Sequence, residues 1–310
     1  MAGPYLILGA TGTVGRRVLA LMAASGHDVR GATRKGAGRG FVNLDLLDPA
    51  GHAAALDGVK TVMLMSRPGD EEAHVHAAPF IKAMVEQGVR RVVVLSALGA
   101  EKYPDFSLRK VELLVERSGL EWTHVRPNFF MQMLAAPPLC HEIAWKGTLS
   151  LPLGGARVAY VDADDVAAVL VRALLDRSLS GRGVDVNGPV ALDHGEVAAR
   201  ISRAAGRDVA YVNLTEEDAR RLLTDRGLTA PHVERVLRFY ALTRAGACAA
   251  PDSTVAALLG RPLGTFEAFA ARHAAAWSPP GTSSDPGAVP RVRAFPRPPS
   301  PARGAADGAS

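Results

Sequence analysis

The chain has 310 residues, of which 48% are hydrophobic and 22% are charged, and its formal net charge is +5. No apolar run reaches the roughly 18 residues of a membrane span, no basic leader with a cleavage site precedes the first apolar segment, and no basic face carries interleaved aromatic residues. We therefore expect a cytoplasmic globular protein that binds neither membranes nor nucleic acids, and the distant Cys140 and Cys248 predict neither a disulfide framework nor a cysteine metal site.

The first predicted elements are a strand, a glycine turn and a helix. The apolar run Tyr5–Leu8 ends at Gly9, and two more glycines follow in the pattern G-x-x-G-x-x-G before an amphipathic segment. Gly9 permits the turn, Gly12 lets a pyrophosphate approach the backbone, and Gly15 lets the helix pack on the strand. With the free N–H groups of a helix N-terminus, the stretch predicts dinucleotide binding; the alternative is a glycine-rich turn that binds nothing. The turn residues expected at the cofactor are Gly9, Thr11, Gly12, Thr13, Val14 and Gly15.

The second predicted strand, Val29–Thr33, ends in two basic residues, Arg34 and Lys35. Sites selective for NAD(H) place an acidic residue at the end of this strand to bind the ribose 2′-hydroxyl, and none is present here. The planar guanidinium of Arg34 suits the additional phosphate of NADP(H). We therefore expect NADP(H) to be preferred over NAD(H), unless Arg34, Lys35 and Arg39 belong only to a solvated basic loop.

Strands and helices alternate up to residue 126, which predicts an α/β fold with a doubly wound parallel sheet of the Rossmann type. Further strands are expected at 41–44, 61–65, 91–95 and 121–126, and helices at 53–56, 71–87 and 106–118. Open sheets of this kind bind ligands at the carboxyl ends of their strands. Residues expected there, near the cofactor, are Asp45, Leu46, Met65, Ser66, Ser96 and Ala97. For Asp45, a role as a loop cap, shared with Asp48, is an equal alternative.

The second half of the chain is less regular and predicts the end of the sheet and a small, mostly helical cap. Strands are expected at 185–187 and 208–212, and helices from 163 onward and at 195–205, 216–226, 232–242 and 263–276. The predicted organisation is a nucleotide-binding domain at 1–155, the rest of the sheet with the substrate and cap region at 156–277, and a disordered tail at 278–310, where Pro, Gly, Ser and Arg predominate.

Clustered acids and histidines are interpreted as structural. Asp162, Asp164 and Asp165 precede an apolar helix and are expected to cap it rather than to bind a metal. His74 and His76 lie two residues apart on a helix and point to different sides, so we expect no metal site there. His124, within a predicted strand, is interpreted as a core histidine.

Three stretches of the sequence match a known family. They are ILGATGTVG at 7–15, VELLVERSGLEWTHVRPNFFMQML at 111–134, and the segment from VDADDVAAVLVRALL to LLGRPLGTFEAFAARHAAAW that ends at Trp277. These stretches resemble the NmrA-like branch of the atypical short-chain dehydrogenase/reductases, over nearly all of residues 3–277. The resemblance implies that Ser96, Pro127, Asn128 and Phe129 border the nicotinamide, and that the region after residue 130 walls a substrate cleft.

The sequence departs from the family's catalytic patterns at two positions. Typical short-chain enzymes use Tyr-x-x-x-Lys, in which the tyrosine donates a proton, whereas Tyr103 is followed four residues later by Ser107. Many relatives place Lys or His fifteen residues before the Thr of the W-T pair, and that position is Leu108 here, which transfers no proton. The catalytic candidates that remain are Tyr103, Lys110 and Ser96, each with a structural alternative as a surface residue or a capping hydroxyl.

These observations favour an NADP(H)-dependent reductase of a small apolar carbonyl or quinone, in bacterial secondary metabolism. A quinone that accepts a hydride takes its proton from water, which tolerates Leu108. Phe130, Met131 and Met133 suit an apolar substrate, although core packing explains them equally well. Two alternatives stay open: a non-catalytic NADP(H) sensor that binds a protein partner, and an epimerase or cyclase that uses the bound cofactor without net redox. We expect a monomer or a homodimer.

Overall fold

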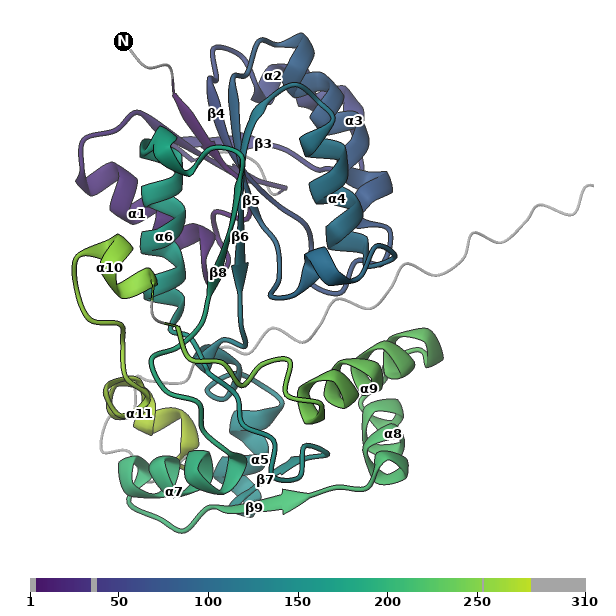
Figure 1. The fold of residues 1–310 in the computed structure, drawn as a ribbon, viewed down its shortest axis with the longest axis vertical. Coiled ribbons are helices and arrows are strands. Elements are labelled where there is room, and N and C mark those ends of the chain that lie inside the picture. The colour runs from purple at the N-terminus through teal and green to yellow at the C-terminus, as the bar shows by residue number, and fades with distance from the viewer. Residues whose placement is uncertain (1–3, 35–37, 253, 280–310) are drawn as a thin grey trace, which may run out of the picture.

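A computed structural model describes residues 4–34, 38–252 and 254–279. Its main element is a sheet of seven parallel strands in the order β3-β2-β1-β4-β5-β6-β8, which confirms the predicted Rossmann-type fold (Figure 1). Lys35 and nearly all of the tail predicted at 278–310 lie outside the described residues. The strands are β1 (Tyr5–Ile7), β2 (Val29–Thr33), β3 (Phe41–Asn43), β4 (Thr61–Met65), β5 (Arg91–Leu95), β6 (Glu121–Pro127) and β8 (Arg182–Val186).

Helices cover both faces of this sheet because successive side chains of a strand point to opposite sides. On β5, Val92 and Val94 pack against the face covered by α2, α3 and α4, whereas Val93 packs against the face covered by α1 and α6. Both faces are apolar, which explains why the central strands are near-continuous apolar runs. The helices are α1 (Gly15–Ala24), α2 (His52–Ala55), α3 (Ala73–Glu86), α4 (Ser107–Glu116) and α6 (Ala163–Leu175), with α10 (Val255–Leu259) beside α6.

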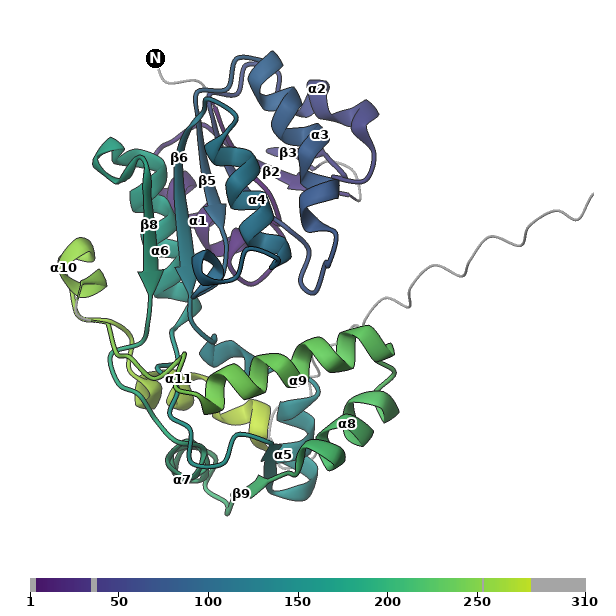
Figure 2. The same cartoon turned by 45° about the vertical axis from the view of Figure 1, so that its right-hand side comes forward.

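The remaining elements form the cap (Figure 2), which has its own hydrophobic core. Its two strands pair in parallel with each other and not with the large sheet. Trp277 is fully buried in this core, and its Nε1 donates a hydrogen bond to the Leu134 carbonyl at 2.8 Å. The cap contains α5 (Leu139–Lys146), β7 (Thr148–Leu151), α7 (His194–Ala205), β9 (Ala210–Asn213), α8 (Glu216–Asp225), α9 (Ala230–Arg244) and α11 (Phe266–His273).

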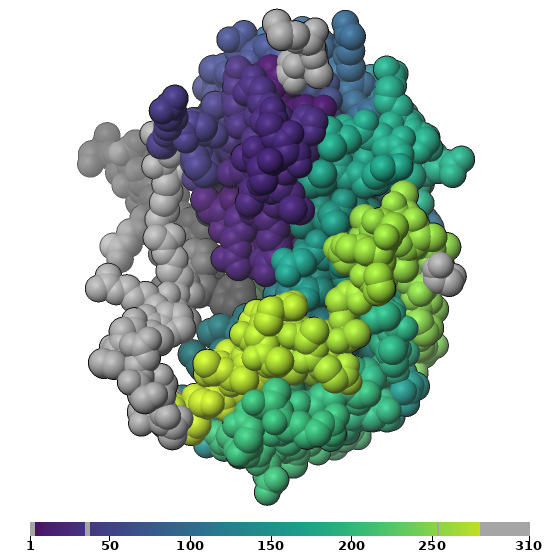
Figure 3. Space-filling view, turned by 90° about the vertical axis from the view of Figure 1, so that its left-hand side faces the viewer, coloured from purple at the N-terminus to yellow at the C-terminus, as the bar shows by residue number. Residues whose placement is uncertain are grey.

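The last described segment bridges the two parts of the molecule. Figure 3 shows the C-terminal yellow-green segment running from beside α6 down onto the cap, with α1 in purple above it. Within this segment α10 contacts α6, and α11 contacts α7. This segment therefore connects the cap to α6, on the face of the sheet that is covered by α1 and α6.

The structure differs from the predicted elements in the second half of the chain. The strand expected at 185–187 begins at Arg182, the strand expected at 208–212 is Ala210–Asn213, and helix α9 is longer than expected at both ends. Three elements were not predicted: α5, β7 and α10. Each has eight residues or fewer, too few to establish a clear period, and each is stabilised by packing against distant parts of the chain.

A buried polar pair in the cap, Tyr160 and His194, makes stability depend on pH. The Tyr160 hydroxyl and His194 Nε2 lie 2.9 Å apart, and His194 is fully buried. Burial lowers the pKa of His194 from 6.5 to about 4, against a smaller opposite effect of Asp193. The unfolded chain therefore binds a proton at a pH where the folded chain does not. This contribution to stability is complete above pH 6.5 and is lost as the pH falls toward 4.

We expect this histidine to lower the free energy of unfolding by about 2 kcal/mol between pH 7 and pH 5. Urea denaturation of the wild type and of His194→Gln across this range measures it, because glutamine keeps a polar group that does not titrate. His141→Gln, at an exposed position, serves as the control. Equal pH dependence in the wild type and in His194→Gln would contradict the assignment.

Among the described helices, none combines the length and the apolar character that a bilayer crossing requires.

Candidate cofactor and substrate site

The glycine turn after β1 disfavours a side chain at two positions, by its positive φ at Gly9 and by close backbone atoms at Gly15. Gly9 has φ +62°, and a Cβ there would lie 2.2 Å from Met65 Sδ. A Cβ on Gly15 would lie 2.2 Å from the Gly9 carbonyl oxygen, and Gly12 N donates to that oxygen at 2.8 Å. Thr11 and Thr13 are exposed beside the turn. The close backbone approach and the free N-terminus of α1 fit a dinucleotide pyrophosphate.

The carboxyl ends of the central strands lie side by side next to this turn. In the parallel register Met65 is opposite Leu95, and Leu95 is opposite Val125. Backbone hydrogen bonds continue the alignment past the strand ends, since Ser96 N donates to Val125 O at 2.8 Å and Leu98 N to Pro127 O at 3.0 Å. The structure therefore brings together, along one edge of the sheet, most of the segments predicted to bind the cofactor.

The residues predicted at the adenosine end differ in their contacts. Arg34 is exposed directly after β2, and no described residue forms an ion pair or hydrogen bond with its side chain. Asp45 Oδ1 accepts a hydrogen bond from Leu47 N at 3.0 Å, and Asp48 Oδ1 accepts one from Ala50 N at 3.1 Å. Both aspartates thus cap their loop, whereas the guanidinium of Arg34 is available to a ligand.

Asn128 fixes the loop after β6. It is 4% exposed, and its Nδ2 donates to Asn187 Oδ1 at 2.8 Å and to the Cys248 carbonyl at 3.0 Å. Its Oδ1 accepts from Phe129 N at 2.8 Å. The amide is therefore used in joining three loops, and it sets the position of Phe129, which begins the segment expected to wall the substrate cleft.

The residues predicted to contact substrate are separated by the structure. Met131 is 1% exposed in the core of the cap, and Phe130 packs beside α6, whereas Met133 is 46% exposed. Phe129 forms an edge contact with Phe239 of α9 at a centroid distance of 5.2 Å. Phe239 was not predicted as a site residue, because it lies on a helix far along the chain and no local pattern relates it to Phe129.

Helix α9 also connects the cap to the nucleotide-binding part of the molecule. Arg235 of α9 forms an ion pair with Glu71, in the loop between β4 and α3, and its guanidinium lies beside Gly69 of the same loop. This loop begins with Ser66, directly after β4. The contact places α9, and with it Phe239, over the same edge of the sheet as the predicted cofactor site.

A buried group of charges lies between α4 and the sheet. Glu112 is fully buried and accepts hydrogen bonds from Arg126 Nε and Nη2 at 2.8 and 2.9 Å and from Arg109 Nη1 at 2.8 Å. Burial alone would raise the pKa of Glu112, but the hydrogen bonds from Arg126 and Arg109 lower it overall. Arg126 passes over Gly183 of β8, where a Cβ would lie 2.5 Å from Nη1.

One catalytic candidate and a core histidine lie near this group of charges. Ser96 is 6% exposed, and its buried hydroxyl has no hydrogen-bond partner among the described residues. His124 is fully buried, as expected for a core histidine; its Nε2 lies 3.2 Å from Glu116 Oε1, and burial lowers its pKa. Because Arg109 and Arg126 neutralise the carboxylates of Glu112 and Glu116, these side chains form an ion-pair network.

The other catalytic candidates lie at the start of α4. Tyr103 and Lys110 are both half-buried, Tyr103 in the turn before the helix and Lys110 in its first turn. Leu108, at the position where relatives carry Lys or His, packs against the apolar core on the α3 side. The catalytic roles of Tyr103 and Lys110 stay predictions. Leucine fits at position 108 because its side chain packs against apolar residues.

Comparison with known proteins agrees with this geometry. The model of the NmrA-like family matches residues 4–243. An NAD(P)H azoreductase from Xenophilus azovorans is 35% identical over 286 residues, which cover 88% of this chain and 98% of that protein. A (4-alkanoyl-5-oxo-2,5-dihydrofuran-3-yl)methyl phosphate reductase from Streptomyces griseus is 36% identical, covering 88% and 99%. The crystal structure of an NADPH-dependent quinone oxidoreductase from Escherichia coli shares the fold, with a TM-score of 0.77 at 21% identity, covering 86% and 99%.

Proposed function

Because the chain belongs to the NmrA-like family, we propose that it is an NADP(H)-dependent reductase of a small apolar quinone or carbonyl compound. The glycine turn carries the proposal, since Gly9 has a positive φ, Gly15 leaves no room for a Cβ, and the N-terminus of α1 is presented to a pyrophosphate. The relatives named as an azoreductase and a reductase, which align over nearly their whole length, support a reductase. NADPH, when bound, supplies the hydride.

In this proposal the chain's own residues bind and orient the reactants. Phe129 and Phe239, which are in edge contact, would supply an apolar wall next to the carboxyl ends of the strands, and the exposed Met133, predicted to contact substrate, would extend it. Leu108 packs against the apolar core and has no proton to give to a substrate oxygen, and Ser96 is only 6% exposed. A quinone suits such a site, since the hydroquinone anion formed by hydride transfer takes its proton from water.

We expect Arg34 to set the preference for NADP(H). Arg34→Ala removes the guanidinium available to the 2′-phosphate and should weaken NADPH binding about tenfold, or ~1.4 kcal/mol, while NADH binding changes little. Calorimetric titration with both cofactors measures the change. Arg39→Ala, a neighbouring exposed arginine, is the matched control. An unchanged ratio of the two affinities in Arg34→Ala, or the same change in Arg39→Ala, would assign these residues to a solvated basic loop.

Oxidation of NADPH by a panel of quinones and ketones tests the reaction itself. We expect loss of NADPH absorbance with at least one quinone and little with the ketones, which need a proton donor at the oxygen. Tight NADPH binding with no oxidation by any acceptor would overturn the reductase and favour a cofactor-sensing regulator. Formation of a product with no net change in NADPH absorbance would favour an epimerase or cyclase.

A further inference from the structure

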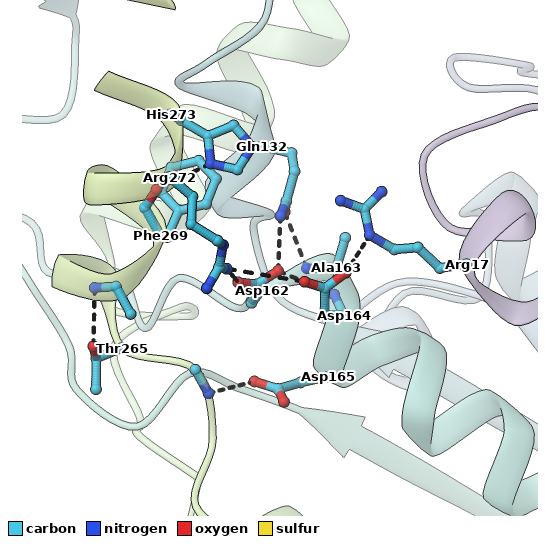
Figure 4. A network of polar contacts seen from close by, with 12 residues as sticks. Arg17, Gln132, Asp162, Ala163, Asp164, Asp165, Thr265, Phe269, Arg272 and His273 are labelled. Carbon is cyan, nitrogen blue, oxygen red and sulfur yellow. Dashed lines mark hydrogen bonds and ion pairs between the residues drawn. The ribbon is translucent and has the colours of Figure 1, made fainter. Parts of the chain in front are cut away.

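The three aspartates at the start of α6 form a polar network with distant parts of the chain (Figure 4). Asp162 is the N-cap and accepts a hydrogen bond from Asp164 N at 3.0 Å, which confirms the capping role expected from the sequence. Asp165 accepts from Gly264 N at 2.7 Å and pairs with Arg261 at 2.7 Å. Capping occupies only some of the oxygens of these carboxylates, and the others contact residues that are distant in sequence.

Arg17 links this network to the glycine turn. Its Nε donates to Asp164 Oδ1, and its Nη1 donates to the Thr13 carbonyl at 2.6 Å. Thr13 belongs to the turn predicted to bind the pyrophosphate, and Arg17 lies in the first turn of α1. A guanidinium with donors fixed in one plane can hold two partners in a set geometry, which a single ammonium cannot.

Gln132 links the same network to the proposed substrate wall. Its Nε2 donates to Asp162 Oδ1 at 2.8 Å, and its Oε1 accepts from Ala163 N at 3.0 Å. Gln132 stands between Met131 and the exposed Met133. The two hydrogen bonds therefore hold the backbone of this segment against the N-terminus of α6.

Arginines from the last described segment balance the charge of the network. Arg272 of α11 lies 2.5 Å from Asp162 Oδ2 and 3.9 Å from Asp164 Oδ2. Asp162 is almost fully buried, whereas the Asp164 side chain is 55% exposed. Asp164 therefore lies between Arg17, which contacts the glycine turn, and Arg272, which belongs to the cap.

We propose that the start of α6 is an anchor that positions both ligands: through Asp164 and Arg17 it holds the pyrophosphate-binding turn, and through Asp162 and Gln132 it holds the substrate wall. Arg17 and Gln132 are positioning residues. The inference rests on the proposed function, because it assumes that NADPH binds at the turn and that a quinone lies near Met133. It adds that the two sites are set by separate branches of one network.

The direction in which one substitution changes the affinity for NADPH distinguishes positioning from the effect of charge alone. Asp164→Asn removes a negative charge near the phosphates, so charge alone predicts NADPH binding that is tighter or unchanged. Positioning predicts weaker binding, since Arg17 loses its anchor; we expect the Kd of NADPH to rise about fivefold by calorimetry. Tighter or unchanged binding overturns this branch. Because the Asp164 side chain is 55% exposed, we expect Asp164→Asn to fold like the wild type.

Arg17→Met and Arg16→Met form a matched pair on adjacent residues of α1. Arg16 is exposed, and no described residue pairs with its side chain. We expect Arg17→Met to raise the Kd of NADPH about tenfold and Arg16→Met to change it less than twofold. Equal effects would show that only the lost charge matters, which overturns the positioning role.

The second branch predicts a separate readout. In Gln132→Met, we expect the KM for 2-methyl-1,4-naphthoquinone to rise about fivefold while the Kd of NADPH stays within twofold. A change in both constants, or in neither, overturns this branch. If the wild type binds no NADPH, the proposed function fails and the inference with it. If the wild type binds NADPH and reduces the quinone while the variants behave like it, the inference alone fails.

Discussion

Replacing Gly15 by alanine is expected to weaken NADPH binding about a hundredfold. The added Cβ would lie 2.2 Å from the Gly9 oxygen, 2.6 Å from the Gly9 carbon and 3.0 Å from Ala10 N. All three are backbone atoms, so no side-chain rotation relieves the contact and the turn itself must move. Overpacking of this kind costs up to ~3 kcal/mol, and a displaced turn transfers that cost to pyrophosphate binding. Calorimetric titration with NADPH measures it.

Gly155→Ala is the matched control for this substitution. Gly155 has no heavy atom within 4 Å of an added Cβ, and its φ is not positive. The same methyl group should therefore leave both NADPH affinity and thermal stability unchanged. An NADPH affinity of Gly15→Ala equal to that of the wild type would show that the turn does not hold the cofactor.

Replacing Arg126 by methionine is expected to lower the free energy of unfolding by about 3 kcal/mol, because it leaves the buried Glu112 without its main partner. Arg126 also pairs with Glu101 at 3.2 Å, so that contact is lost as well. Arg109 still contacts Glu112 and limits the loss. Equilibrium denaturation in urea at neutral pH measures the change.

Two further variants separate burial from the loss of an arginine. Arg177→Met removes a partner of Glu121 on the surface, where the Arg177 side chain is 75% exposed, and should cost less than about 1 kcal/mol. The double variant Arg126→Met with Glu112→Gln should recover more than half of the loss, since it removes the uncompensated charge. A double variant as unstable as Arg126→Met would show that packing of the arginine, rather than its charge, stabilises the helix.

The nucleotide-binding half of the fold follows from local sequence patterns. The strands expected at 29–33, 61–65 and 91–95 coincide with β2, β4 and β5, because each is an apolar or β-branched run between turn residues. The glycine spacing predicted the turn, and parallel pairing then placed the strand ends together. In this part of the chain, residues that contact each other are either near in sequence or lie on strands that the sheet order places side by side.

The cap and the contacts between its helices could not be predicted in the same way. Phe239 meets Phe129, and Arg17 meets Asp164, across more than a hundred residues, and nothing in either local sequence indicates the partner. Leu149 and Leu151 alternate with polar residues in β7, but four residues are too few to distinguish a strand from a loop. Ser96 was placed correctly at a strand end, but the burial of its hydroxyl depends on packing by elements distant in sequence.

Titration of the full-length chain with NADPH and with NADH by calorimetry tests the central claim most directly. If the turn after β1 holds the pyrophosphate, NADPH will show saturable binding at one site per chain, tighter than that of NADH. The absence of heat and of any thermal stabilisation with both nucleotides would contradict the account, and the proposals for the reductase and for the α6 anchor would have to be abandoned together.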